Sequence, residues 1–243
     1  MRRILQIDGE TISVAAESRF EDERYLQDAI TARPEVLPSE DLGLGPLIAL
    51  ARELDLGSGP MDLLTADPAG RIVIVEFKRG SENPDVRQVV AQLLDYGVSL
   101  WRTSFDELDQ RCQEREPAQG AALCELAAER CATLDVEFDP EKFRTGVEDS
   151  LDRGDFVFLY VGRDLDERSR RIMTFLAEGP RMTFFAVEVD YFPQADSSSA
   201  ALVPRTTSFP RGSANRLRAA AGRVMPWRPP RQSSTNWSSG WIS

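Results

Sequence analysis

One stretch, residues 71–78 (RIVIVEFK), restricts the fold of this chain more than any other segment. In a β-strand, successive side chains point to opposite faces of the sheet. Here both faces are apolar until two charged residues, Glu76 and Lys78, appear at the end of one of them. A strand buried on both faces is typical of the interior of an α/β sheet. We therefore expect an α/β fold in which a mixed central sheet is flanked by helices.

The four residues before this strand, 67–70 (DPAG), favour a tight turn. A proline at the second position and a left-handed glycine at the fourth are typical of a three-residue hairpin loop with a bulge. This loop pairs Asp67 with Arg71, so the numbers of paired residues add up to 138. Asp62 then lies opposite Glu76, with the two Cβ atoms roughly 5 Å apart.

Two facing carboxylates repel each other unless a cation lies between them. Mg²⁺ prefers carboxylate and water oxygens, so it would stabilise a pair formed by Asp62 and Glu76. Lys78 lies further along the same face, where it could hold a nucleophilic water or neutralise developing phosphate charge. The hairpin therefore predicts a metal site beside a lysine.

Two helices supply further candidates for this site. On the helix that follows the strand, Gln88, Gln92 and Tyr96 form a polar stripe at i, i+4 and i+8 beside the apolar face. On an earlier helix, Glu23 shares a face with apolar residues rather than with its charged neighbours. A carboxylate on the packing side of a helix suggests a third acidic group for the site.

The rest of the chain fits an α/β order of elements. We expect one domain over 1–192, with a helical insertion over 104–150 that breaks at 117–120, and a disordered tail rich in Ser, Pro and Arg over 193–243. The expected elements are a hairpin around Asp8-Gly9, a helix from Ser18 (paired with Glu21 as a capping box) to Pro34, a strand within 45–56, a helix from Asn83-Pro84 to Leu100, a strand at 156–162, a helix capped by Asp164, and a strand ending at Phe192.

Composition narrows the function classes. The 243 residues include no histidine, which excludes catalytic systems and metal sites that need an imidazole. Three cysteines form neither a disulfide framework nor a C-x2-C pair, and no segment resembles a signal peptide or a membrane span. We therefore expect a cytoplasmic protein with no membrane partner. Residues 197–243 carry seven arginines and no acid, which leaves 22 basic and 40 acidic groups in 1–196. This acidic body argues against a broad phosphate-binding face.

The pattern of these residues resembles the PD-(D/E)XK nuclease superfamily. The likeness lies in Asp62, thirteen intervening residues, the run Glu76-Phe77-Lys78, and Gln92-x-x-x-Tyr96 on the next helix. Within that superfamily the chain is most similar to NucS-like, DUF91-type endonuclease domains. That closer likeness comes from Glu23-x-x-Leu26-Gln27, which leads into residues 33–37 (RPEVL).

The resemblance implies a restriction-endonuclease-like core and a Mg²⁺-dependent endonuclease that hydrolyses DNA phosphodiester bonds, in DNA repair or defence. It implies that Asp62, Glu76, the Phe77 carbonyl and Glu23 hold Mg²⁺, for which Mn²⁺ would substitute. Lys78 would orient the attacking water, and Gln92 and Tyr96 would position the phosphate or Lys78.

Plainer interpretations stay open. Asp62, Glu76 and Lys78 could form an ordinary salt bridge at a strand end, Gln92 and Tyr96 could be a solvated stripe, and Glu23 could be a surface residue. Arg168, Arg170 and Arg171 could contact a phosphate backbone, although a solvated helix face is the simpler interpretation. A second function class is a non-catalytic nuclease-fold module that binds nucleic acid or a partner protein. A homodimer is also compatible with the sequence.

Overall fold

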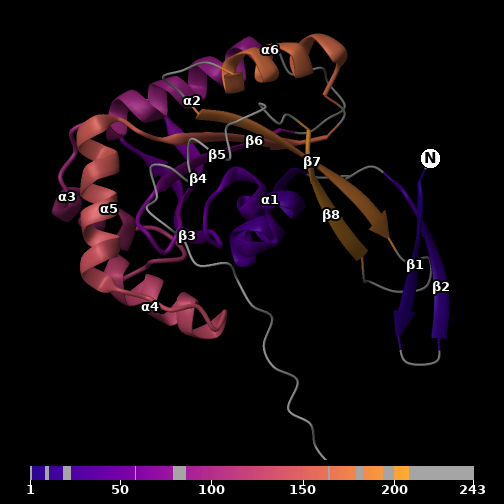
Figure 1. Cartoon of the computed structure of the whole chain (residues 1–243), viewed down its shortest axis with the longest axis horizontal. Helices are drawn as coiled ribbons and strands as arrows, with labels where there is room; N and C mark the ends of the chain where they lie inside the picture. The colour runs from indigo at the N-terminus through magenta and orange to yellow at the C-terminus, as the bar shows by residue number, and fades with distance from the viewer. Residues whose placement is uncertain are drawn as a thin grey trace, which may run out of the picture.

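The computed structural model contains a six-stranded mixed sheet flanked by helices, as expected for an α/β fold (Figure 1). It describes residues 2–8, 11–18, 23–57, 59–78, 86–163, 165–178, 183–193 and 200–207. The elements in chain order are β1 Arg3–Asp8, β2 Thr11–Ala16, α1 Glu23–Ala32, the 3₁₀ turns η1 Pro34–Val36 and η2 Ser39–Leu42, β3 Ile48–Asp55, β4 Pro60–Ala66, β5 Ile72–Lys78, α2 Val86–Leu100, α3 Phe105–Gln113, α4 Leu123–Thr133, α5 Pro140–Arg153, β6 Val157–Gly162, α6 Glu167–Glu178, β7 Thr183–Pro193 and β8 Ala200–Thr206.

The sheet follows the order β3-β4-β5-β6-β7-β8. Strands β3, β4 and β5 are antiparallel to one another, β5, β6 and β7 run parallel, and β8 returns antiparallel to β7. β5 is therefore an interior strand, and its six residues before Lys78 are all buried. This confirms the prediction drawn from its two apolar faces.

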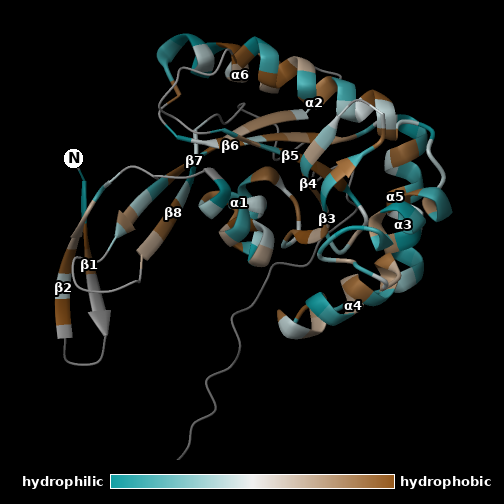
Figure 2. Ribbon diagram, turned by 180° about the vertical axis from the view of Figure 1, so that it is seen from behind, coloured by the Kyte–Doolittle hydropathy of each residue, from teal (hydrophilic) through white to brown (hydrophobic). Residues whose placement is uncertain are grey.

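Each face of the sheet has its own hydrophobic core. Side chains of α2 to α6 pack on the face that carries Ile72 and Ile74. Leu26 and Ile30 of α1 pack on the opposite face. Hydrophobic and hydrophilic residues alternate along α2 and α6, as expected for helices with one buried face (Figure 2). None of the described helices is long and apolar enough to cross a bilayer.

The turn before β5 has the predicted form. Gly70 is left-handed, with φ of 80°, and its N–H donates to the Asp67 carbonyl at 2.9 Å. The Asp67 carboxylate also accepts from the backbone N–H of Ala69 and Arg71, at 3.0 Å each. Glycine is required here for a second reason, because a Cβ on Gly70 would lie 2.1 Å from the Phe143 carbonyl oxygen of α5. The turn is therefore fixed both by its own hydrogen bonds and by the helix packed on it.

The N-terminal hairpin β1-β2 forms a separate two-stranded sheet, and its loop residues 9–10 lie outside the described residues. The predicted helix cap at Ser18 is wrong. The Ser18 N–H donates to the Tyr191 carbonyl at 2.8 Å, so this residue bridges the hairpin to β7, and α1 starts at Glu23. Glu21 lies outside the described residues.

The C-terminal boundary also needs correction. The sequence places the end of the domain at 192, but β8 pairs with β7 along seven residues, so the sheet extends to Thr206. Residues 208–243 are not described. Within 104–150 the predicted helices are present as α3, α4 and α5, with the expected interruption between α3 and α4. Asp164 lies outside the described residues, and Asp166 caps α6 by accepting the Ser169 N–H at 2.6 Å.

Candidate active site

The two carboxylates predicted to face each other lie at the end of the β4-β5 pair. The observed partners run from Ala66 with Ile72 to Leu63 with Val75, and all of them add up to the predicted value of 138. One step further along, Asp62 lies beside Glu76, close enough for the charge of Asp62 to raise the pKa of Glu76.

Asp62 also closes the end of the ladder. Its Oδ2 accepts the Phe77 N–H at 2.8 Å, in the place where a carbonyl of β4 would continue the pairing. Burial raises the pKa of Asp62, and the hydrogen bond from Phe77 only partly offsets this effect. The N–H and C=O of one residue in an antiparallel ladder face the same neighbouring strand. The Phe77 carbonyl is therefore directed toward the side of Asp62, beyond the last regular pair.

Glu76 is the most buried acid of the site, with 1% of its surface exposed. Burial and the neighbouring Asp62 carboxylate together raise the pKa of Glu76 to about 7, against the opposing effect of Lys78. Its Oε1 accepts a hydrogen bond from Lys78 Nζ at 2.5 Å. Its Oε2 is buried and receives no hydrogen bond from any side chain that the structure describes. Burying such an oxygen without a donor is costly, which makes it a natural ligand position for a cation.

Lys78 lies between these two carboxyl groups and the solvent. Its side chain is 24% exposed, whereas that of Glu76 is 2% exposed. The two residues are separated by one residue of β5, so they project from the same face, as predicted. One ammonium group faces two carboxyl groups, and the cluster lacks a second positive charge among the described residues.

α2 brings Tyr96 to the same cluster. The Tyr96 hydroxyl donates to the Pro60 carbonyl at 2.9 Å, which ties α2 to the start of β4. Burial, followed by the nearby charges of Glu76 and Asp62, raises the pKa of Tyr96 above its usual value. Gln92, one turn earlier, is half-buried, and the structure records no hydrogen bond from it to the other described site residues. Its predicted contact with phosphate stays a prediction.

Glu23 is the first residue of α1, and its side chain lies outside what the structure describes. α1 packs on the face of the sheet opposite to Glu76. A ligand role for Glu23 would require its side chain to reach around the end of the strands, and it stays a prediction.

The structure adds neighbours that the sequence did not indicate. Tyr160 is fully buried on β6 directly beside Glu76, and its hydroxyl lies against Gly162, where a Cβ would come within 2.4 Å of it. Glu188 of β7 pairs with Gly162 and is also buried. These positions come from parallel pairing between strands far apart in the sequence, so no local pattern marks them.

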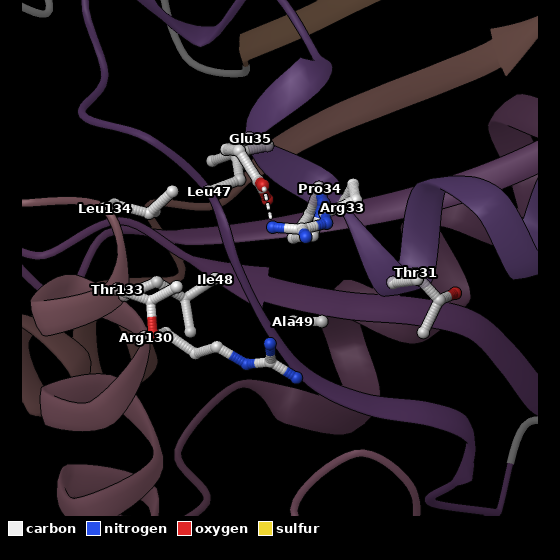
Figure 3. A pocket seen from close by; sticks show the side chains of 11 residues that line it. Thr31, Arg33, Pro34, Glu35, Leu47, Ile48, Ala49, Arg130, Thr133 and Leu134 are labelled. Atoms are coloured by element: carbon white, nitrogen blue, oxygen red, sulfur yellow. Dashed lines mark hydrogen bonds and ion pairs between the residues drawn. The ribbon is translucent and has the colours of Figure 1, made fainter. Parts of the chain in front are cut away.

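A separate pocket lies at the start of β3, the strand next to β4, toward the end of β4 that is farther from Asp62 (Figure 3). α1, η1 and the end of α4 also line it, with Arg33 and Arg130 among the lining side chains. None of the predicted site residues lines it, so it is not part of the carboxylate cluster.

The donor set of the cluster suits Mg²⁺. The described residues contain no group of three or more acidic, cysteine or histidine side chains arranged to hold a metal. Mg²⁺, however, usually keeps several waters and binds through one or two carboxylates. Asp62, the orphaned Oε2 of Glu76 and the Phe77 carbonyl provide this number of ligands. No protein-family model, curated protein or solved structure matches the chain.

Proposed function

We propose that this protein is a metal-dependent endonuclease that hydrolyses DNA phosphodiester bonds. The observation that carries the proposal is the pair formed by the half-buried Asp62 and the buried Glu76. Within the described residues Glu76 Oε2 accepts no hydrogen bond, and the partly exposed Lys78 lies beside the pair. The resemblance of these residues to those of PD-(D/E)XK nucleases, which cut DNA, supports the same proposal and suggests a role in DNA repair or defence.

An ordinary structural salt bridge accounts for this arrangement less well. A buried ion pair is stable when each charge has a partner and its remaining lone pairs accept hydrogen bonds. Here a second carboxyl stands beside the Lys78–Glu76 pair and raises the pKa of Glu76 to about 7, so the pair is not balanced. An uncompensated buried acid lowers the stability of the fold, and binding of a divalent cation would restore that stability.

In the proposed site, Asp62, Glu76 and the Phe77 carbonyl hold Mg²⁺, with Glu23 as a further candidate ligand and Mn²⁺ as a substitute. When bound, the ion would polarise the scissile phosphate and lower the pKa of a bound water. Lys78 holds the attacking water and offsets the charge that develops on the phosphate. Tyr96 keeps α2 against β4 through Pro60, and Gln92 contacts the phosphate.

The test is a cleavage assay with purified protein on linear, circular, single-stranded and branched DNA, with Mg²⁺, Mn²⁺ or chelator. Cleavage should require the divalent ion and should be lost in Lys78→Ala. The chain offers a matched control in Lys142, its only other lysine, which is exposed on α5. Lys142→Ala should cut as wild type does, and both variants should keep the wild-type circular dichroism spectrum.

Full activity in Lys78→Ala would remove the lysine from the chemistry and refute the assigned mechanism. DNA binding without metal-dependent cleavage of any substrate would instead favour the second function class, a nuclease-fold module that binds nucleic acid without cutting it.

A further inference from the structure

α6 differs in charge from the other helices that the structure describes. It carries three arginines against two glutamates, whereas α1 to α5 are neutral or acidic. The rest of the body is strongly acidic, so any contact with a polyanion must be local. α6 is therefore the first helix to consider for a contact with phosphates.

The three arginines do not have the same role. Arg170 turns toward the sheet and donates to the buried Glu188 at 2.9 Å. Arg168 and Arg171 are exposed, and neither guanidinium forms an ion pair with a residue in the described ranges. Asp166 caps α6 by accepting the Ser169 N–H, and its carboxylate also attracts the charge of the nearby Arg168 without forming an ion pair with it. The side chains of Arg168 and Arg171 are therefore exposed and unpaired within the described residues, so they can contact a ligand.

An exposed aromatic ring lies on the same side of α6 as Arg168 and Arg171. Phe175 is 77% exposed, which is more than any other large apolar side chain in the described residues. At 100° per residue, Arg168, Arg171 and Phe175 fall within one narrow sector of the helix, opposite the buried Ser169 and Met173. From Arg168 to Phe175 the strip is about 10 Å long.

This strip starts close to the candidate active site. Glu188, which Arg170 contacts, pairs with Gly162, and Gly162 pairs with Lys78. Neighbouring strands are separated by about 4.8 Å, so Glu188 lies roughly 10 Å from Lys78 across the same edge of the sheet. Side chains of α6 pack on the face that carries Ile74 and Glu76, the same face as α2 (Figure 1). A polymer bound at Lys78 could therefore continue over α6.

We infer that the strip formed by Arg168, Arg171 and Phe175 binds single-stranded DNA leading to or from the carboxylate cluster. The inference rests on the proposed function and specifies its substrate. Free guanidinium groups contact phosphates, and an exposed ring provides a surface on which a base can stack. A phenyl ring on a convex helix can stack only with an unpaired base, because the bases of a duplex are already stacked inside it. The two arginines alone would bind either single-stranded or duplex DNA, and Phe175 favours the single strand.

The experiment measures binding by fluorescence anisotropy, using full-length protein that carries Glu76→Gln and buffer that contains chelator, so no cleavage occurs. The probes are a labelled single strand of mixed sequence, the same strand in a duplex, and an RNA of the same sequence. Phe175→Ala should weaken single-strand binding about 5- to 140-fold, the range that corresponds to removal of one stacking aromatic. Arg168→Gln with Arg171→Gln should lower the slope of log affinity against log salt by about 1.4, since each phosphate contact on a single strand contributes about 0.7.

Two matched controls isolate the strip. Leu5→Ala removes an apolar side chain that is 68% exposed on the hairpin. Arg33→Gln with Arg153→Gln removes two arginines whose side chains are 69% and 68% exposed on other elements. Both controls should leave affinity and salt slope at wild-type values.

Unchanged affinity in Phe175→Ala, equal or tighter binding of the duplex, binding of RNA alone, or an equal loss in the controls would each overturn the inference. None of these results depends on cleavage. Failure of the proposed function would appear instead as a wild-type protein that binds through the strip but cuts no DNA with Mg²⁺.

Discussion

The substitution Glu76→Gln separates a metal site from a structural salt bridge without any substrate. The pKa of Glu76 is raised from 4.5 to about 7 by burial and by Asp62. Between these two pH values the unfolded chain has released its proton and the folded chain has not, so wild-type stability falls as pH rises through this window. Above pH 7 the full penalty is present, at most about 3 kcal/mol from a shift of about 2.5 pKa units.

The amide of glutamine has the size of the protonated acid and carries no charge, so it avoids this penalty. Glu76→Gln should melt at the same temperature as wild type near pH 4.5 and at a higher temperature at pH 8. For a chain of this size, 3 kcal/mol corresponds to a difference of roughly 6–12 °C. Differences between variant and wild type at each pH remove the contribution of titrating groups that do not interact with Glu76.

The assay is a set of melting curves by circular dichroism from pH 4.5 to 8, with and without Mg²⁺. Mg²⁺ should raise the melting temperature of wild type at pH 8 and leave the variant unchanged. Asp62→Asn should behave like Glu76→Gln, because burial also raises the pKa of Asp62. Asp190 provides the contrast, since this buried acid accepts from two arginines, Arg2 and Arg205. Asp190→Asn should lower the melting temperature, as the loss of a balanced partner does.

A structural salt bridge gives the opposite sign at Glu76. Removing one partner of a buried pair leaves the other uncompensated, which costs about 3–5 kcal/mol. Strong destabilisation of Glu76→Gln at pH 8, together with no response of wild type to Mg²⁺, would refute the metal-site argument.

Three further outcomes follow from the same geometry. Mg²⁺ affinity, measured by calorimetry, should increase as pH rises through about 7, because the ion competes with the proton on Glu76; an affinity independent of pH would contradict the coupling. Tyr96→Phe should lower the free energy of unfolding by about 1 kcal/mol in denaturant titrations, because it removes the hydrogen bond to the Pro60 carbonyl. An unchanged midpoint would show that this bond does not contribute to stability. Gly146→Ala should destabilise by about 3 kcal/mol or more in the same titrations, since its Cβ would lie 1.8 Å from the Ala69 carbonyl oxygen; wild-type stability would show that α5 can shift away from the turn.

Local chemistry was sufficient to predict the register of the central hairpin. The tight turn at 67–70 allows one pairing of the strands it joins, and a one-residue error would have placed Asp62 on the wrong face. The arrangement of Asp62 with Glu76, and of Lys78 with Glu76, followed from that register alone. Helical spacing predicted that Gln92 and Tyr96 share one stripe of α2, whereas the hydrogen bond from Tyr96 to the Pro60 carbonyl was not predicted.

Other elements depend on contacts that no local pattern contains. Ser18 has the spacing of a helix cap, but its N–H is used by Tyr191, far along the chain. β8 contains Pro204 and is only partly buried along its length, so its composition resembles that of a tail. Proline is compatible with an edge strand, where one side of the backbone needs no partner. Pairing with β7, rather than any intrinsic pattern, makes this segment a strand.

The buried acids on this face of the sheet divide into two kinds by their partners. Glu188 accepts from the guanidinium groups of Arg170 and Arg205 and from the Leu165 N–H, so its charge is fully compensated. Glu76 on β5 lies two strands away from Glu188, and Asp62 on β4 lies three strands away. One ammonium group, that of Lys78, faces both Glu76 and Asp62. Arginine is available in the chain and is used for Glu188, so the imbalance at Asp62 and Glu76 does not reflect a general lack of cations. Within the described residues the pair lacks one positive charge, and this local deficit supports the proposal that a divalent ion binds between β4 and β5.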